Sequence, residues 1–502
     1  MSQVALAAGS GSVFVGTARG VFLLASMPRS RLEMDRVRTS NGAWRILMLA
    51  LFAVAPAVLL TRVSATPALL IIIAFVSVVL LAAVLAAFAG ALTLRNSALI
   101  LWTLLISYRA FIPRNTGLDM SGFAWDIAAS AEVLVTVVIF TLSLFLFLGS
   151  VATNRLGALP LTIKLLGLYA IVAVASLLYT PRPFYAGFWL MRLVSSLALF
   201  AVYFGSAGPA DPTVFAGFTV SAMLPTVFLP WIYILQGASL SHGRFAGSWL
   251  HPIQTSIVAY TVGTFFLLPW VGGCRNRAAP FIAAACFASG FIGAGKVAVV
   301  VVGAVLLVTL LTSIRRWFSF RVVSALVLIA LAIGLLLLTK PDLGLLAHWQ
   351  TYQHSDFGTL KGRFSLWDVG VSTWLDSPIV GRGFASTRIL QFAIPGTGWT
   401  PSNAHSSFLE PLIEVGLLGA MPLFVAIFIV LSRIIRLGPP PFPTKSVTPI
   451  AAAWCVLLLC GSVDMVFGGL LHPPTYMFYG LLVCLDAATR ILPSLRESRG
   501  RP

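Results

Sequence analysis

Charge is scarce in this chain, and its scarcity sets the class of protein. Only 10% of the residues are Asp, Glu, Lys or Arg, whereas 59% are hydrophobic. Soluble domains carry about 25% charged and about 45–50% apolar residues. The composition therefore excludes a soluble enzyme, a disordered chain and a disulfide-rich secreted domain. It predicts an all-α fold, a polytopic transmembrane helix bundle.

The patterns that usually bind metal ions are also missing. The five Cys form no Cys-x-x-Cys, no Asp-x-Asp occurs, and no two His lie one helical turn apart. Proteins that hold a sugar diphosphate through a metal ion usually rely on acidic ligands. We therefore expect neither a metal ion nor another cofactor.

Nucleotide binding is excluded in a similar way. The run Gly290-Phe-Ile-Gly-Ala-Gly295-Lys296-Val297 has the spacing of a P-loop. A P-loop needs Ser or Thr at the last position and a strand before it. Here the last residue is Val297, and the run lies between two apolar segments. Lys296 is then either a snorkelling Lys or a ligand-contacting cation at an outer turn.

What the chain has instead is a series of apolar runs. A transmembrane helix needs about 20 apolar residues. Runs that predict helices lie at 44–62, 67–94, 97–112, 127–149, 159–178, 188–206, 213–236, 252–272, 278–293, 296–314, 321–339, 406–432, 447–469 and 474–489. Some of these runs are short, so we expect about 12 to 14 spans.

The charge that is present is strongly positive. Lys and Arg number 33 against 15 Asp and Glu, a formal net charge of +18. With both termini in the cytoplasm, roughly two thirds of the basic residues fall in cytoplasmic segments, as the positive-inside rule predicts. The excess therefore indicates orientation and no nucleic-acid partner. The remaining basic residues lie on the outer side, and so do all six His.

One long polar stretch, 340–405, interrupts the apolar pattern. A long ordered loop between spans is usually functional. Within it, the segment 359–376 predicts an amphipathic helix that lies on the membrane surface. Its apolar side chains recur at helical spacing: Phe364, Trp367, Val371 and Trp374. The expected parts are a cytoplasmic N-terminal extension at 1–43, a transmembrane bundle of about 11 spans at 44–339, a periplasmic loop at 340–405, C-terminal helices at 406–489 and a cytoplasmic tail at 490–502.

The most informative motifs lie on the predicted outer side. In chain order they are Gly243-Arg244-Phe245 with His251-Pro252, Lys361-Gly-Arg363-Phe-Ser-Leu-Trp367, Pro378-Ile-Val-Gly381-Arg-Gly383, Asn403-Ala-His405, and Glu410 with Glu414-Val-Gly416. These motifs, their order, the many spans and the large outer loop resemble the O-antigen ligase and polysaccharide polymerase family of bacterial membrane proteins. The resemblance extends over about residues 160–435, and its specific motifs lie in the last third.

The resemblance implies a glycosyltransferase of the bacterial inner membrane whose active site faces the periplasm. Its donor would be a glycan on undecaprenyl diphosphate, and it would use no metal and no nucleotide. The acceptor would be a lipid A core sugar for a ligase, or another lipid-linked repeat unit for a polymerase. The Gly295-Lys296 turn and the Gly-Arg-Phe-Ser-Leu-Trp form favour the polymerase slightly. A chain-length regulator and a flippase are further expected partners, beside the lipid bilayer itself.

The residues are chemically suited to this reaction. A diphosphate is a good leaving group when its developing charge is neutralised, and guanidinium groups can do this in place of Mg²⁺. The candidates on the outer side are Arg182, Arg192, Arg244 and Arg363. His405 is the candidate general base for the acceptor hydroxyl, since His titrates near neutral pH.

Further residues are candidates for support. Glu410 and Glu414 lie one helical turn apart, where they could orient an Arg or bind a loop backbone. His251 and Lys296 are the other two. Each candidate also has a structural alternative: an interfacial His405, a snorkelling Arg192, an ion pair at Arg244, a solvated Arg363, a capping His251 or a helix-packing Glu414.

Two other functions fit a polytopic chain. A polysaccharide flippase or other secondary transporter would need charged or broken helices at mid-membrane and repeat symmetry between its halves. No repeat is visible, and most candidate charges lie near outer span ends. A noncatalytic assembly scaffold would not need Arg and His gathered on one face.

Overall fold

The computed structural model describes part of the chain. The described residues are 93–107, 127–154, 156–206, 210–228, 252–271, 276–292, 296–311, 363–388, 390, 392, 403–436, 447–464, 466–467 and 472–499. All of them belong to one unit, Ser64–Pro502. The expected spans at 44–62 and 321–339, most of 67–94, and the candidates Arg244 and His251 lie outside this description.

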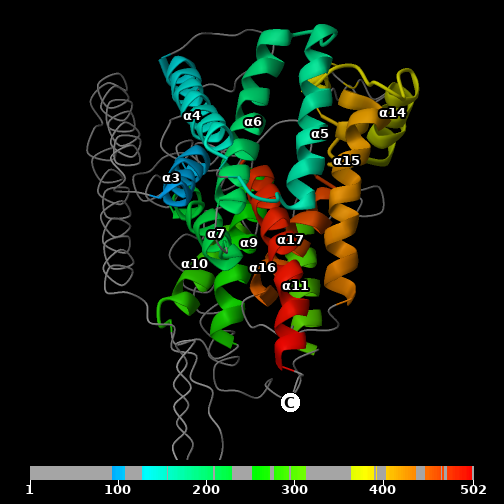
Figure 1. The fold of residues 1–502 in the computed structure, drawn as a ribbon. Coiled ribbons are helices and arrows are strands. Elements are labelled where there is room, and N and C mark those ends of the chain that lie inside the picture. Colours follow the sequence, from blue (N-terminus) through cyan, green and yellow to red (C-terminus); the bar gives the residue numbers. More distant parts are fainter. Residues whose placement is uncertain are drawn as a thin grey trace, which may run out of the picture. The chain divides into compact units, whose positions relative to one another are not determined.

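Every regular element among the described residues is a helix (Figure 1). The helices are α3 (Leu94–Ser107), α4 (Ile127–Ala152), α5 (Leu161–Ala175), η2 (Ser176–Leu178), α6 (Pro183–Gly205), α7 (Pro212–Ser221), α9 (Pro252–Val271), α10 (Ala279–Ile292), α11 (Lys296–Leu311), α14 (Arg363–Leu375), η5 (Ser386–Arg388), α15 (Leu409–Arg436), α16 (Val447–Gly461) and α17 (Pro473–Arg499). In the part of the chain that the structure describes, five helical stretches are long and apolar enough to cross a membrane: 132–152, 161–178, 183–205, 253–271 and 409–436. The predicted all-α, polytopic bundle is therefore confirmed.

Local sequence explains several helix boundaries. Pro183 and Pro212 stand at the first positions of α6 and α7, where a missing N–H costs nothing. The side chain of Asp211 caps α7 by accepting hydrogen bonds from the backbone N–H groups of Thr213 and Val214. The apolar runs therefore place the helices, and Pro and Asp residues fix where they begin.

One predicted span is too long. The run 447–469 predicts a single helix, but α16 ends at Gly461. The backbone N–H groups of Ser462, Val463 and Asp464 turn back to the carbonyls of Leu459 and Cys460. This turn closes the helix and brings Asp464 out of it.

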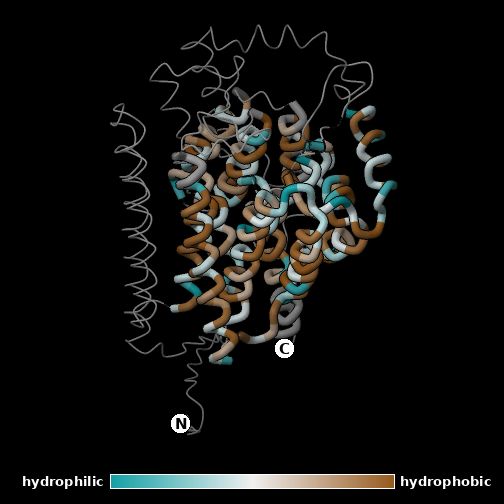
Figure 2. Tube along the Cα trace, turned by 90° about the horizontal axis from the view of Figure 1, so that it is seen from above, coloured by the Kyte–Doolittle hydropathy of each residue, from teal (hydrophilic) through white to brown (hydrophobic). Residues whose placement is uncertain are grey.

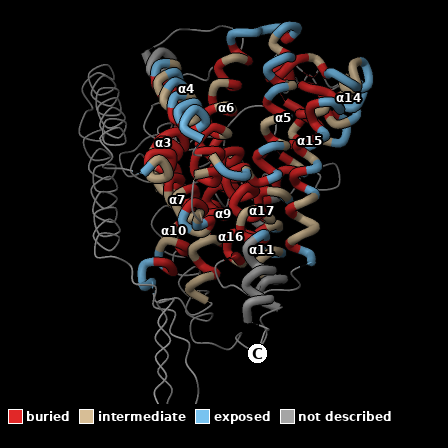
Figure 3. Tube along the Cα trace, in the orientation of Figure 1, coloured by how far each residue is buried: buried red, intermediate tan, exposed pale blue. Residues whose placement is uncertain are grey.

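Apolar residues cover the described helices, as Figure 2 shows. Their exposed faces are apolar too: Ile171 on α5 is 66% exposed and Phe428 on α15 is 69% exposed. Figure 3 shows exposed positions along α4, α5 and α15, whereas α16 and α17 are mostly buried. Exposed apolar faces on long helices are expected where lipid is the solvent.

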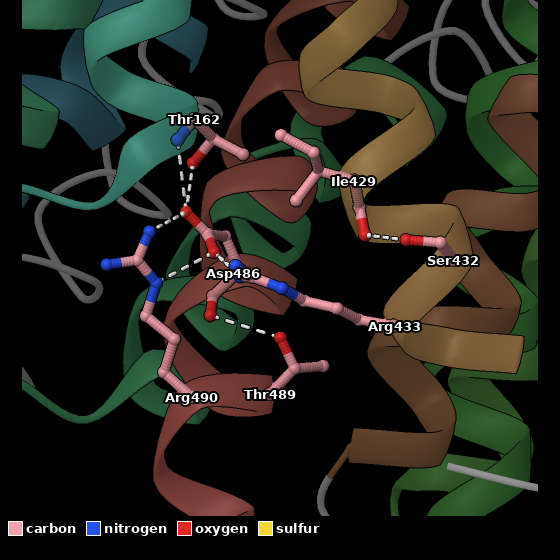
Figure 4. A network of polar contacts seen from close by, with 7 residues as sticks. All are labelled: Thr162, Ile429, Ser432, Arg433, Asp486, Thr489 and Arg490. Atoms are coloured by element: carbon pink, nitrogen blue, oxygen red, sulfur yellow. Dashed lines mark hydrogen bonds and ion pairs between the residues drawn. The ribbon is translucent and has the colours of Figure 1, made fainter. Parts of the chain in front are cut away.

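A buried carboxylate joins three of these helices (Figure 4). Asp486 on α17 is fully buried and accepts hydrogen bonds from the backbone N–H and hydroxyl of Thr162 at the start of α5, at 3.1 and 2.8 Å. Arg490 contacts both of its oxygens, at 2.9 and 3.1 Å, and Arg433 in the last turn of α15 binds it as well. The network therefore fixes α5, α15 and α17 to one another.

Candidate functional site

Asp464 brings two of the predicted site residues together. Its Oδ1 lies 3.5 Å from Nδ1 of His405, and its Oδ2 lies 3.5 Å from Nη2 of Arg363. Arg363 begins α14, His405 stands before α15, and Asp464 follows α16. The three side chains are 13%, 21% and 9% exposed, respectively. They form a mostly buried cluster that keeps some access to its surroundings.

Ser407 holds this cluster in place. Its hydroxyl donates to the carbonyl of Asp464 at 2.9 Å and accepts from the backbone N–H groups of Val466 and Phe467, at 2.7 and 3.0 Å. Its own N–H donates to the carbonyl of Gly461 at 2.8 Å. One donation and two acceptances use the full capacity of a hydroxyl. The turn that carries Asp464 is therefore fixed to the segment that carries His405.

The backbone of His405 adopts an uncommon conformation. Its φ is +47°, in the left-handed region that residues other than Gly rarely occupy. The side-chain oxygen of Asn403 accepts a hydrogen bond from the His405 N–H at 3.0 Å and so supports this turn. Strained backbone of this kind concentrates at functional sites. Here Asn403 supplies part of the compensation.

The Pro378-x-x-Gly381-x-Gly383 motif packs against a kink in α15. Gly416 has φ +62° and ψ −171°, so the helix is interrupted there. A Cβ at Gly416 would lie 2.2 Å from the carbonyl oxygen of Ile379, which no side chain could tolerate. The kink therefore lets the motif approach the helix backbone.

Backbone hydrogen bonds join the two segments at this kink. The N–H of Gly383 donates to the carbonyl of Glu414 at 2.8 Å, and the N–H of Leu417 donates to the carbonyl of Pro378 at 2.9 Å. The kink frees these groups from the helical ladder, and the motif satisfies them. The spacing of the motif thus reflects a backbone ladder, which explains why Gly residues stand in it.

The same loop is also bound to the end of α5. The N–H of Phe384 donates to the hydroxyl of Ser176 at 2.9 Å, and the hydroxyl of Thr180 donates to the carbonyl of Phe384 at 3.0 Å. The hydroxyl of Tyr179 donates to the carbonyl of Val380 at 2.6 Å. Loop 377–388 therefore connects the end of α5 with α15.

The amphipathic helix predicted over 359–376 is confirmed as α14, Arg363–Leu375. Trp367 and Trp374 pack against a buried apolar group formed by Leu366, Phe392, Ala404, Leu409 and Ile413. Phe364 and Val371 are instead 50% and 40% exposed. The two Trp side chains thus anchor α14 to the protein, which fixes the residue at its start, Arg363. Its expected place on the membrane surface stays a prediction.

Both candidate glutamates are completely buried. Oε1 of Glu414 accepts a hydrogen bond from the hydroxyl of Thr387 at 2.6 Å and so binds η5. The carboxylate oxygens of Glu410 have no hydrogen-bond partner among the described residues. The charges of Arg388 and Asp464 act on the Glu410 carboxyl. Glu414 thus supports the loop, and Glu410 is buried one helical turn before it.

A second cationic contact lies at the start of α17. Nη2 of Arg388 lies 3.2 Å from Nε2 of His472, and the His472 ring packs edge-on against Trp189 with ring centroids 5.5 Å apart. Because Arg has only donors, the neutral form of His472 can accept this hydrogen bond. The motif pattern singled out neither residue, and their contact arises from the tertiary fold.

Arg192 and Arg182 are placed differently from Arg363. Arg192 is fully buried on α6 and forms an ion pair with Glu132 at 2.6 Å, with its guanidinium over the rings of Phe188 and Trp189 at 4.3 and 4.6 Å. Arg182 is exposed at the N-terminal cap of α6. A diphosphate-binding role for either residue stays a prediction. Lys296 begins α11, and its side chain lies outside the description.

Sequence reasoning missed Asp464. The predicted span 447–469 included it, so it was not expected in the site. Its signal is the presence of an acidic residue in an apolar run, where a buried charge is costly and often functional. Within the described residues, no group of three or more His, Cys, Asp and Glu side chains could hold a metal ion. The expected absence of a metal stays a prediction.

Comparison with known families is consistent with this geometry. Residues 278–424 match the sequence model of the family described as O-antigen ligase. This part of the chain is therefore similar to that family. No curated protein matches the chain. The O-antigen ligase match includes Arg363, the loop motif and His405, whereas Asp464 and His472 lie beyond it. It confirms the resemblance to the O-antigen ligase and polymerase family.

Proposed function

We propose that this protein transfers a glycan from undecaprenyl diphosphate to an acceptor sugar hydroxyl at the periplasmic face of the bacterial inner membrane. The similarity to the O-antigen ligase family and the membrane-spanning helices support the class of enzyme. The observation that carries the proposal is the cluster of Arg363, Asp464 and His405. It joins a guanidinium suited to a diphosphate with an imidazole suited to a hydroxyl proton.

In the proposed reaction the acceptor oxygen attacks the anomeric carbon of the donor sugar. The bond from that carbon to the diphosphate breaks, and its electron pair leaves with undecaprenyl diphosphate. The acceptor proton passes to His405. Because Nδ1 of His405 faces Asp464, Nε2 is the nitrogen left for this proton. Asp464 stabilises the positive charge that the ring then carries.

Arg363 supplies the charge that the leaving group requires. A guanidinium forms bidentate contacts with phosphate and stays positive at any physiological pH. In a site that excludes water, such a fixed donor lowers the barrier more than it would in water. Arg244, Arg192 and Arg182 are the further candidates for the same diphosphate, and no metal or nucleotide takes part.

The acceptor determines whether the enzyme is a polymerase or a ligase. The Gly-Arg-Phe-Ser-Leu-Trp form at Arg363 and the Gly295-Lys296 turn favour a polymerase that joins lipid-linked repeat units. In a ligase the acceptor would be a lipid A core sugar. In either case the enzyme would work with a flippase that delivers the donor, and a polymerase would also work with a chain-length regulator.

The glycan phenotype of a deletion strain tests this proposal. Single repeat units on the core, without long polymer, are expected for a polymerase. Polymer that stays on the lipid carrier is expected for a ligase. In both cases wild-type protein must restore the phenotype and His405→Ala must not. An unaltered envelope glycan, or donor accumulating on the cytoplasmic leaflet as for a lost flippase, would contradict the proposal.

A further inference from the structure

Asp464 is shared between the proposed base and the proposed diphosphate ligand. One carboxylate oxygen faces His405 and the other faces Arg363, each at 3.5 Å. The Arg363 contact stands at the outer limit of a hydrogen bond, and the His405 contact is an ion-pair contact at the same distance. Neither contact is tight, so the carboxylate can move closer to one of these two side chains.

The position of Asp464 does not depend on its carboxylate. Its carbonyl accepts from the Ser407 hydroxyl at 2.9 Å, and its N–H donates to the carbonyl of Cys460 at 3.0 Å. Arg363 instead reaches the carboxylate through a long, flexible side chain from the first residue of α14. The contact between Arg363 and Asp464 is therefore easier to give up than a contact fixed by the backbone.

We propose that Asp464 couples donor binding to activation of the acceptor. This inference rests on the proposed function. The donor diphosphate competes with Asp464 for Arg363. When Arg363 turns to the diphosphate, the carboxylate is left to His405. It then fixes the ring and stabilises the charge that forms when the ring takes the acceptor proton.

Such coupling orders the reaction. Without a donor, Arg363 and His405 share the charge of Asp464. With a donor bound, the same carboxylate supports His405 fully. The acceptor hydroxyl is then activated only when a diphosphate is ready to leave. Asp464 acts here as a positioning residue, because it is not required to touch either substrate.

The coupling predicts that Asp464→Asn strengthens anion binding but slows transfer. Removing the charge removes the competitor of the diphosphate, so binding of the anion tightens. The same change removes the carboxylate that faces Nδ1 of His405, so transfer slows. A merely structural role would weaken both properties, since a disturbed site would bind and react less well. The backbone contacts of Asp464 remain available to Asn.

Two measurements on the purified full-length protein in detergent test this. The first is the Kd for inorganic pyrophosphate, and the second is turnover with a glycan on undecaprenyl diphosphate. For Asp464→Asn we expect pyrophosphate binding about 3–10-fold tighter, the worth of one loose charged contact. We expect turnover roughly 10–100-fold lower, as when a supporting carboxylate is lost. The tightening should vanish in the double variant Arg363→Gln/Asp464→Asn.

The chain offers a matched control in Asp376→Asn. Asp376 pairs with Arg382 at 2.5 Å on the loop beside the cluster, and its side chain is 62% exposed. This variant should leave both pyrophosphate binding and turnover unchanged. Asp464→Ser provides a second uncharged variant, with the same opposite effects expected, so the test does not depend on how well one variant folds.

The outcomes distinguish failure of the coupling from failure of the proposed function. Unchanged or weaker pyrophosphate binding in Asp464→Asn and Asp464→Ser would overturn the coupling. If His405→Ala nevertheless abolishes transfer in that experiment, the proposed function stands without it. Full transfer by His405→Ala would overturn the proposed function itself, whatever the effect of Asp464 on pyrophosphate binding.

Discussion

Two aspartates in this protein are each bound by arginine, but with very different tightness. Asp486 is completely buried and is held by Arg490 and Thr162 at 2.8 to 3.1 Å, with Arg433 as a further partner. Asp464 keeps partial exposure, and its contacts with Arg363 and His405 are both 3.5 Å. The same types of residue thus form a closed network in one place and an open one in the other.

The position of each network along α15 explains the difference. His405 stands just before α15, and Arg433 lies in its last turn, so the networks occupy opposite ends of a helix about 40 Å long. The closed network joins three helices, where every hydrogen-bonding position of the carboxylate is filled. The open one joins the turn after α16, the segment before α15 and the first residue of α14, where partners remain able to exchange. Tightness therefore separates a structural role from a proposed catalytic one.

The largest expected effect concerns the closed network. Asp486→Ala leaves two guanidinium groups and the start of α5 without their shared partner, so it should lower the free energy of unfolding by about 3–5 kcal/mol. Thermal unfolding of the protein in detergent measures this. Asp376→Ala, which opens an exposed pair, is the control and should change stability by at most about 1 kcal/mol. Equal effects of the two variants would refute the structural role of Asp486.

Substitution of Arg192 tests whether a third ion pair, Arg192–Glu132, has a structural or a catalytic role. It is fully buried against Glu132, Phe188 and Trp189. Arg192→Met leaves the Glu132 carboxyl buried without its cation and should cost about 3 kcal/mol or more of stability.

A double variant separates the two roles of Arg192. Because Met and Gln keep the volume without the charges, Arg192→Met/Glu132→Gln should recover much of the stability that the single variant loses. Recovery of transfer along with stability would assign Arg192 to structure. Stability without transfer would assign its guanidinium to the diphosphate, the role expected for Arg192 from the sequence.

Substitutions in the open network should lower activity and leave stability unchanged. Arg363→Lys keeps the charge but loses the planar fork, so we expect kcat/KM for the lipid-linked donor to fall about 10²-fold. The melting temperature should stay close to that of the wild type. Arg382→Lys, on the loop that follows α14, is the matched control, because Arg382 pairs with the exposed Asp376 and not with Asp464. Comparable losses in both variants would show that Arg363 has no special role.

The smallest expected effect is that of a chelator. If guanidinium groups replace a metal ion, transfer should be the same with and without EDTA. The measurement is the rate of transfer by purified protein before and after chelation. Loss of activity that Mg²⁺ restores would contradict the metal-free chemistry and would require a site among residues that this description does not include.

The sequence predicts local features of the site and fold, but not contacts that depend on tertiary structure. The apolar runs placed the helices, and the motifs selected Arg363 and His405, because both signals are local. Asp464 was not predicted as a site residue because the apolar run 447–469 indicates one continuous helix. Only the turn after Gly461 places Asp464 outside that helix. The contact between Arg388 and His472 was not predicted either, since it joins residues far apart in the chain.

The Pro378-x-x-Gly381-x-Gly383 motif shows a different limit of prediction from sequence. Its spacing indicated a family and a turn, but not the kink at Gly416 that receives it. A ladder between a loop and an interrupted helix depends on the backbone of both segments, which residue types alone do not determine. The sequence thus predicted which residues matter there, and the structure supplies the reason.

Transfer by His405→Ala tests the central claim most directly. Purified protein would be given a glycan on undecaprenyl diphosphate and an acceptor, and the transferred product would be quantified. We predict a rate at least about 10²-fold below that of the wild type, the usual worth of a general base, with an unchanged melting temperature. Wild-type transfer by this variant would contradict the account.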